Sequence, residues 1–132
     1  MQTKQQQRAE FALNKISTLK IDKETANFYA GAPTMILTNG LGQTMAFLLT
    51  KKDKERKLFD ILKEWLTANK NPLAPLKDKK NAQFLQAFNE LPIAKYTEAQ
   101  TEALRILEWI KRYAKAFEVK DEKTREKDNV GN

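Results

Sequence analysis

The feature that most constrains this chain is the spacing of its apolar residues, which recur every three or four positions over long stretches. That period places apolar side chains along one face of an α-helix, whereas a half-buried strand would need strict alternation. Helix-breaking residues are few, with four prolines and four glycines in 132 residues. The sequence therefore predicts an all-α protein, folded as a compact single-domain bundle of about six helices.

Start and stop signals divide the N-terminal half into helices. The first is expected over residues 3–19, and Asp22 can cap the second because its carboxylate accepts a free backbone N–H. Pro33 suits a first helical turn, and Asn39-Gly40 is typical of a helix end. Asn-Gly is also a strong hairpin signal. We favour helices, because apolar residues after Gly40 keep helical spacing and a lone hairpin would have no sheet to join.

The C-terminal half is divided in the same way. A charged connector over 51–57 leads to a helix whose apolar face extends to Leu66, and a proline-containing loop follows. A short helix is expected over 82–91 and should stop at Pro92. Thr97 and Gln100 then form a capping-box pair, which predicts a last helix from there to about Val119.

The chain ends in a segment of different character. Residues 120–132 alternate charges with almost no apolar side chain, so we expect a disordered tail after a helical domain of residues 1–119. No stretch approaches the ~20 apolar residues needed to span a bilayer. The N-terminus lacks the apolar core of a signal peptide. We therefore expect a cytoplasmic protein without a membrane partner.

The absence of cysteine and histidine excludes many kinds of active site. There can be no zinc site of the usual kind, no disulfide, no thiol nucleophile and no imidazole base. Glu98, Glu102 and Glu108 could be imagined as metal ligands, but they do not share one helix face. We expect a protein that is not an enzyme, with no metal, no cofactor and no small-molecule substrate.

Positive charge is in excess and is unevenly placed. The 24 basic and 17 acidic residues give a net charge of +7. Residues 1–20 carry a net +3, from four basic and one acidic, and residues 50–80 carry a net +5, from ten basic and five acidic. This pattern suits a polyanion such as RNA, but similar basicity is common in proteins that bind nothing charged.

Three groups of cations are candidates for contact with such a partner. One row lies on the first helix, beside Phe11 and away from the apolar face. A second lies opposite the core face of the last helix, where Trp109 sits between two arginines. The third belongs to the connector. Together they are Lys4, Arg8, Lys15, Lys51, Lys52, Arg105, Lys111, Arg112 and Lys115.

Two interpretations of these cations remain open. Arginine offers fork-like donors to phosphate, and an aromatic side chain can stack on a base. Alternatively, Glu102 and Glu108 pair with cations one turn away, and the last helix simply presents a solvated face. In that case Phe11 and Trp109 pack against neighbouring helices.

Four segments of the chain have a distinctive order of residues: Pro33-x-x-Ile36-x-x-Asn39-Gly40-Leu41-Gly42-Gln43-x-x-Ala46-Phe47-Leu48, Gln7-Arg8-Ala9, Trp65-Leu66 and Glu102-Ala103-Leu104-x-x-Leu107-x-Trp109-x-Lys111-Arg112-x-Ala114. These segments resemble a known family, the small helical subunit of the type III-B CRISPR effector (Cmr, or RAMP module, complex). The resemblance extends in order over most of residues 3–117.

The resemblance implies a non-catalytic all-α subunit of an RNA-targeting ribonucleoprotein. Its partners would be other Cmr subunits, including copies of itself stacked beside the backbone filament, and the guide RNA–target RNA duplex, touched through the target backbone. Arg8, Lys111 and Arg112 match family motif positions. Asn39, Gly40 and Gln43 match too, and we expect them to end one helix and start the next.

A second hypothesis belongs to a different class of function. The protein could be purely a protein–protein scaffold, whose basic faces bind acidic surfaces of its partners. Reversal of the basic charges would then block incorporation of the subunit without changing the RNA affinity of the remaining complex.

Overall fold

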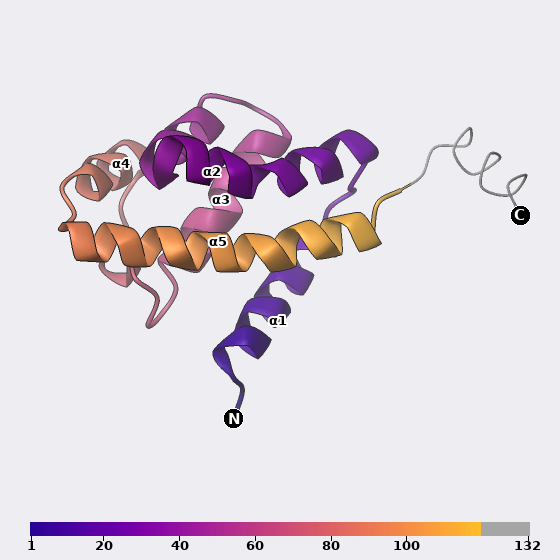
Figure 1. The fold of residues 1–132 in the computed structure, drawn as a ribbon, viewed down its shortest axis with the longest axis horizontal. Coiled ribbons are helices and arrows are strands. Elements are labelled where there is room, and N and C mark those ends of the chain that lie inside the picture. The colour runs from indigo at the N-terminus through magenta and orange to yellow at the C-terminus, as the bar shows by residue number, and fades with distance from the viewer. Residues whose placement is uncertain (120–132) are drawn as a thin grey trace, which may run out of the picture.

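The computed structural model describes residues 1–119, and within them every regular element is a helix (Figure 1). The all-α prediction is confirmed. The predicted disordered tail, residues 120–132, lies outside the described residues. The elements are α1 (Lys4–Ile16), α2 (Lys23–Leu49), α3 (Lys54–Leu66), a 3-10 turn (Ala74–Leu76), α4 (Asn81–Asn89) and α5 (Ile93–Ala116).

The N-termini of the first two helices are fixed by local capping. Thr3 and Gln6 form a capping box at the start of α1, each side chain accepting from the other's backbone N–H. Asp22 caps α2 as predicted, because its carboxylate accepts the N–H of Thr25 at 2.7 Å. Such caps satisfy donors that have no partner within the helix.

Helix α2 is interrupted at Gly40, where the sequence predicts a helix end. Gly40 has φ 83° and ψ 160°, a conformation that is essentially confined to glycine. The helix resumes at once, so the hairpin alternative is wrong. Two side chains of α5 cap the resumed helix: Gln100 accepts the Leu41 N–H at 2.9 Å, and the Tyr96 hydroxyl accepts the Gly42 N–H at 3.0 Å.

The start of the last helix differs from the prediction. Helix α5 begins at Ile93, directly after Pro92, rather than at Thr97. Pro92 is in an extended conformation (φ −57°, ψ 149°), and a proline at this boundary removes an N–H that would have no helical partner. The side chain of Gln100 is used by α2, so it forms no capping box with Thr97.

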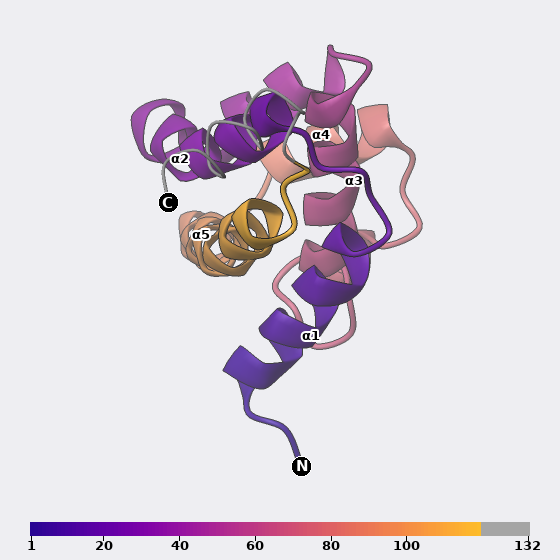
Figure 2. The ribbon, with the colours of Figure 1, turned by 90° about the vertical axis from the view of Figure 1, so that its right-hand side faces the viewer.

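Helix α5 is the central element of the bundle. It contacts α1, α2 and α3, and it runs alongside α2 in the opposite direction (Figure 1). The view down α5 shows α1 and α2 on different sides of it (Figure 2). The predicted core face is largely confirmed, since Ala103, Ile106 and Ile110 are fully buried. Phe117, directly after the helix, is 47% exposed.

Candidate nucleic-acid interface

A buried ion pair joins the first and last helices. The Arg8 guanidinium donates from Nε at 2.6 Å and from Nη2 at 2.8 Å to the two carboxylate oxygens of Glu102. Trp65 of α3 donates its indole N–H to the same carboxylate at 2.9 Å. Both charged residues are buried, with 5% and 7% of their surface exposed. Helices α1, α3 and α5 therefore meet at the Glu102 carboxylate, whose charge is neutralised by Arg8.

The buried position of Glu102 and its hydrogen bonds act on the pKa of its carboxyl group in opposite directions. Burial alone would raise the pKa of its carboxyl group. The hydrogen bonds from Arg8 and Trp65, with the positive charges of Arg8 and Lys4, outweigh burial and hold the pKa below its usual value. Glu102 is therefore ionised at neutral pH and neutralises Arg8.

The remainder of the α1 row is packed rather than free. Phe11 lies against Trp65 with their ring centroids 4.9 Å apart, and the Lys4 ammonium is 5.0 Å from the Trp65 ring. Lys15 pairs with Glu64 at 2.5 Å. Of the two open interpretations of this row, packing against neighbouring helices is the one observed, since Phe11 lies on Trp65 of α3 and Arg8 binds Glu102 of α5. Arg8 is thus placed inside the domain.

A recess of about 400 Å³ opens beside this buried pair, and we call it the basic recess. Its cations come from three separate parts of the chain: Lys4 of α1, Lys70 of the loop after α3, and Arg105 of α5. The other lining residues are Asn71, Pro72, Glu98, Thr101 and Glu102. The structure therefore brings Lys4 and Arg105 together, as two of the predicted site residues.

Acidic residues in the basic recess are already paired. Glu102 is neutralised by Arg8, and Glu98 pairs with Lys95 at 3.2 Å. Lys70 and Arg105 are exposed and have no ion-pair partner within residues 1–119. The recess consequently carries uncompensated positive charge.

Sequence reasoning missed Lys70 as a site residue. It lies in the loop after α3, beyond the C-cap residue Thr67, and its backbone is in the left-handed region, with φ 69°. The neighbouring Asn71 is buried, accepts a hydrogen bond from Lys4 and donates to the Trp65 carbonyl at 2.5 Å. The Asn-Lys-Asn-Pro sequence marked a helix end but gave no indication that this loop returns to α1.

The cations near the end of α5 follow the solvated-face interpretation. Lys111 and Arg112 approach Glu108 at 3.1 Å and 3.9 Å, and Lys115 pairs with Glu118 at 3.2 Å. Arg112 nevertheless keeps 72% of its side chain exposed. Trp109 is partly buried and donates to Gln5 of α1 at 3.3 Å, so it packs rather than standing free.

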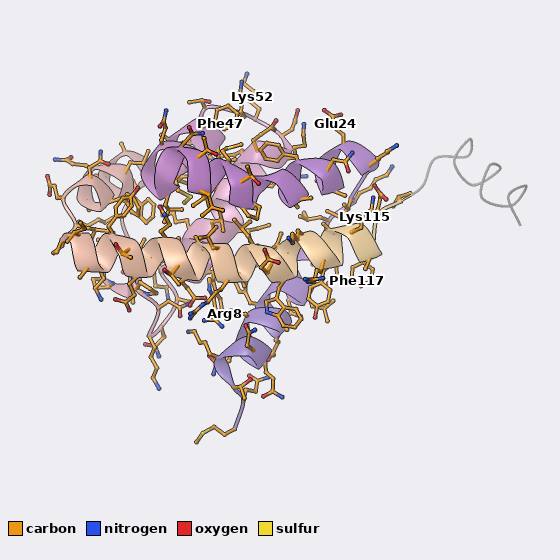
Figure 3. The ribbon with its side chains drawn as sticks, viewed as in Figure 1. Arg8, Glu24, Phe47, Lys52, Lys115 and Phe117 are labelled. Carbon is orange, nitrogen blue, oxygen red and sulfur yellow. The ribbon has the colours of Figure 1, made fainter. Side chains whose placement is uncertain are left out.

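The third group lies elsewhere on the molecule. Lys51 and Lys52 are exposed, and the Lys51 ammonium lies 5.3 Å from the centre of the Phe47 ring. Lys52 and Phe47 are on the opposite side of α5 from Arg8 (Figure 3). The predicted cations therefore form separate surfaces rather than one continuous patch.

Residues 1–119 contain neither a cluster of metal ligands nor a membrane-spanning helix. No group of three or more His, Cys, Asp or Glu side chains there is arranged to hold a metal ion. No helix in that range is long and apolar enough to cross a membrane.

The fold and the surface define the class of protein: a small all-α domain with exposed cations on several separate surfaces. A family model, CRISPR-associated protein (Cas_Cmr5), matches residues 4–117. The chain therefore belongs to the Cmr5 family, the small subunit of the type III-B Cmr CRISPR complex. Members are structural subunits, generally non-catalytic, and association with other Cmr subunits follows from membership. The resemblance noted in the sequence is confirmed.

Proposed function

We propose that this protein is a non-catalytic subunit that stacks in several copies beside the backbone filament of the Cmr complex. In that position it contacts the phosphate backbone of the target RNA in the guide–target channel. The observation that carries the proposal is the basic recess, where Lys4, Lys70 and Arg105 converge from three parts of the chain with their acidic neighbours already neutralised.

Phosphate contacts of this kind suit the task. In an RNA-guided complex, base pairing with the guide reads the sequence, so the protein needs to recognise only duplex shape and charge. Phosphate contacts fix register and orientation without carrying sequence information. Arg105 can offer a bidentate fork, while Lys70 and Lys4 act as point charges.

The other predicted cations of α1 and α5 would contribute to RNA binding in different ways. Arg112 and Lys115, with 72% and 65% of their side chains exposed, extend the positive surface along α5. Lys111 and Lys15 can exchange their ion-pair partners for phosphate. Arg8 acts differently: it holds α1 against α5 and so sets the separation of Lys4 from Arg105.

The scaffold hypothesis is favoured by a different observation. Several large apolar side chains are exposed, among them Leu37 (69%), Ile93 (85%) and Phe117 (47%). Ile93 and Phe117 lie at the two ends of α5, where they can meet neighbouring subunits. Contacts between subunits and contacts with RNA can coexist, but the scaffold hypothesis in its pure form requires no RNA contact.

Salt dependence of RNA binding by the isolated protein tests the proposal. A duplex of RNA strands labelled with a fluorophore would be titrated at several salt concentrations. Binding should weaken steeply with salt, because each neutralised phosphate releases counterions. The double variant Lys70→Gln with Arg105→Gln should reduce the slope of log K against log salt by about 2, at about 1 for each phosphate contact.

A matched control removes the same charge elsewhere. Lys23 and Lys77 are exposed and lie outside the basic recess. Their double substitution by Gln should leave the slope nearly unchanged. Equal slopes for the two double variants would contradict the assignment of RNA contact to the basic recess.

A further inference from the structure

A second, smaller recess lies on α2 and spans the interruption at Gly40. It measures about 190 Å³ and is lined by Met35, Asn39, Gln43, Thr44 and Phe47. We propose that this recess, which we call the α2 recess, binds a single unpaired nucleobase of RNA. The inference rests on the proposed function only in taking RNA as the ligand, since the residues of the two recesses are different.

A buried hydroxyl without a partner points to a missing ligand. Thr44 is 1% exposed, and its Oγ1 has no hydrogen-bond partner within residues 1–119. A threonine inside a helix commonly donates to the carbonyl four residues earlier. Buried polar groups are almost always satisfied, so an orphan hydroxyl in the wall of a recess requires an explanation. Thr44 lines the recess, and a rotation of its side chain about χ1 would bring this hydroxyl, whose oxygen is itself shielded from solvent, to a polar atom of a bound base.

Two free amides provide the pattern that a base edge needs. Asn39 and Gln43 lie one turn apart, on either side of Gly40, and both are exposed. Neither side chain is engaged by another side chain or backbone group in the part of the chain that the structure describes. Each amide carries a donor and an acceptor, which is the complement of the Watson–Crick or Hoogsteen edge of an unpaired base.

An aromatic ring and two cations complete the arrangement. Phe47 is 39% exposed and forms one side of the recess, where it can stack on a base. Lys51 lies 5.3 Å from the centre of that ring, and both Lys51 and Lys52 are exposed. A phosphate attached to the bound nucleotide would meet these ammonium groups. Figure 3 shows Phe47 and Lys52 on the same side of the molecule.

These features favour a nucleotide over a protein side chain as the occupant. An aliphatic side chain would use Met35 and Phe47 but would leave the Thr44 hydroxyl and both amides unsatisfied. A nucleotide uses the hydroxyl, the amides, the ring and the neighbouring positive charge together. We therefore assign a nucleotide as the occupant of the α2 recess. If a neighbouring subunit docks there instead, the test below would show it.

The test is a nuclear magnetic resonance titration of the full chain with each of the four ribonucleoside monophosphates. We expect saturable shifts of the Asn39 and Gln43 side-chain amide resonances and of the Met35 methyl group. Ribose 5-phosphate, which has no base, should leave them unchanged. If the amides do not move with any nucleotide, or move equally with ribose 5-phosphate, the proposal is overturned.

Substitution of Thr44 tests whether its hydroxyl contributes to nucleotide binding without changing the stability of the fold. Thr44→Val keeps the shape of the side chain and removes the orphan hydroxyl, so the thermal midpoint should not fall. Nucleotide binding should weaken by up to about tenfold, the loss expected for one hydrogen bond. Undiminished nucleotide affinity in this variant would contradict the role assigned to the hydroxyl. The matched control is Thr34→Val, the same substitution at an exposed position of α2 outside the recess, which should leave these shifts intact.

The outcomes also distinguish the two proposals from each other. If nucleotides fail to shift Asn39 and Gln43 while the salt slope still depends on Lys70 and Arg105, the α2 recess fails and the proposed function stands. If the shifts occur but the salt slope does not depend on those cations, the reverse holds. Shifts that appear only on addition of other Cmr subunits would identify a protein docking surface and overturn the nucleotide proposal.

Discussion

The pairing of Arg8 with Glu102 shows how a single buried contact determines where α1 lies. Both carboxylate oxygens are used by Arg8, and the Trp65 indole shares one of them. A buried ion pair gives little net stability, but removal of one partner is costly because the other charge stays buried. The contact consequently specifies the arrangement of α1, α3 and α5 more than it adds to overall stability.

Arg8→Ala should lower the free energy of unfolding by about 3–5 kcal/mol, because the Glu102 carboxylate would remain buried without its partner. Urea denaturation followed by circular dichroism measures the change. Arg112→Ala is the matched control, since its side chain is 72% exposed and 3.9 Å from Glu108. That exposed pair should contribute no more than about 1 kcal/mol. Similar losses in the two variants would contradict the structural role of Arg8.

The lowered pKa of Glu102 predicts a pH dependence of stability. The unfolded chain should titrate near the ordinary value of 4.5, while the folded carboxyl titrates below it. Below its unfolded pKa the unfolded state binds more protons, so stability falls as pH drops through that value toward the folded pKa. Above it this contribution is fully present. Denaturation at a series of pH values measures it.

Glu102→Gln provides the comparison for the pH series, because it removes the titrating group and keeps the size of the side chain. The variant should lose less stability between neutral and acidic pH than the natural protein does. If both lose the same amount, the acid sensitivity comes from other carboxylates.

At the scale of helices, two features stabilise the interruption of α2 at Gly40, which we call the junction. Gly40 provides a backbone conformation that other residues rarely adopt, and α5 supplies the two side-chain caps that the resumed helix needs. Tyr96 also packs on Phe88 with ring centroids 4.9 Å apart. The junction therefore ties α2, α4 and α5 together and sets the positions of Asn39 and Gln43.

Substitution of two glycines in α2 by alanine should have effects of opposite sign. Gly40→Ala should cost about 1–3 kcal/mol, because alanine is strained at φ 83° and ψ 160° and its Cβ would lie 3.1 Å from the Tyr96 hydroxyl. Gly31 is helical, and an added Cβ would meet nothing within 4 Å. Gly31→Ala should stabilise the protein by about 0.5–1 kcal/mol.

Thermal and urea unfolding of the two alanine variants, measured side by side, would check this prediction. A loss of stability at Gly31 as large as that at Gly40 would contradict the account of the junction.

Features that depend on residues close together in the chain could be predicted from the sequence, whereas features that depend on distant contacts could not. Asp22 as a cap, the interruption at Gly40 and most of the α5 core face were predicted because each depends on residues close together in the chain. Gln100 was assigned to the wrong partner because its real contact is 59 positions away. Arg8 was placed outside because its partner, 94 positions away, is invisible to helical spacing.

The candidate site was predictable to a smaller extent. Lys4 and Arg105 could be proposed from their charge, but only the packing of α1 across α5 brings them into one recess. Lys70 had no local signal, because its role depends on the return of the loop after α3 to α1. Surfaces built from several elements follow from tertiary packing, which a single sequence does not reveal.

At the scale of the whole molecule, the described residues carry two separate recesses lined by polar side chains. The basic recess lies where α1 meets α5, and the α2 recess lies where Phe47 and Lys52 are seen, across α5 from Arg8 (Figure 3). Exposed apolar residues mark both ends of α5. Under the proposed function, this division would let a stacked subunit meet its neighbours and RNA through different surfaces.

The most direct test of RNA contact through the basic recess uses the assembled Cmr complex. Complexes would be reconstituted with the natural subunit, with Lys70→Gln and Arg105→Gln together, or with the control pair Lys23→Gln and Lys77→Gln. Subunit stoichiometry and target RNA affinity would be measured at two salt concentrations. We expect normal incorporation of all three, with weaker and less salt-dependent RNA binding only for the recess variant. Unchanged affinity and salt dependence, or failure of that variant alone to incorporate, would contradict it and favour a pure scaffold.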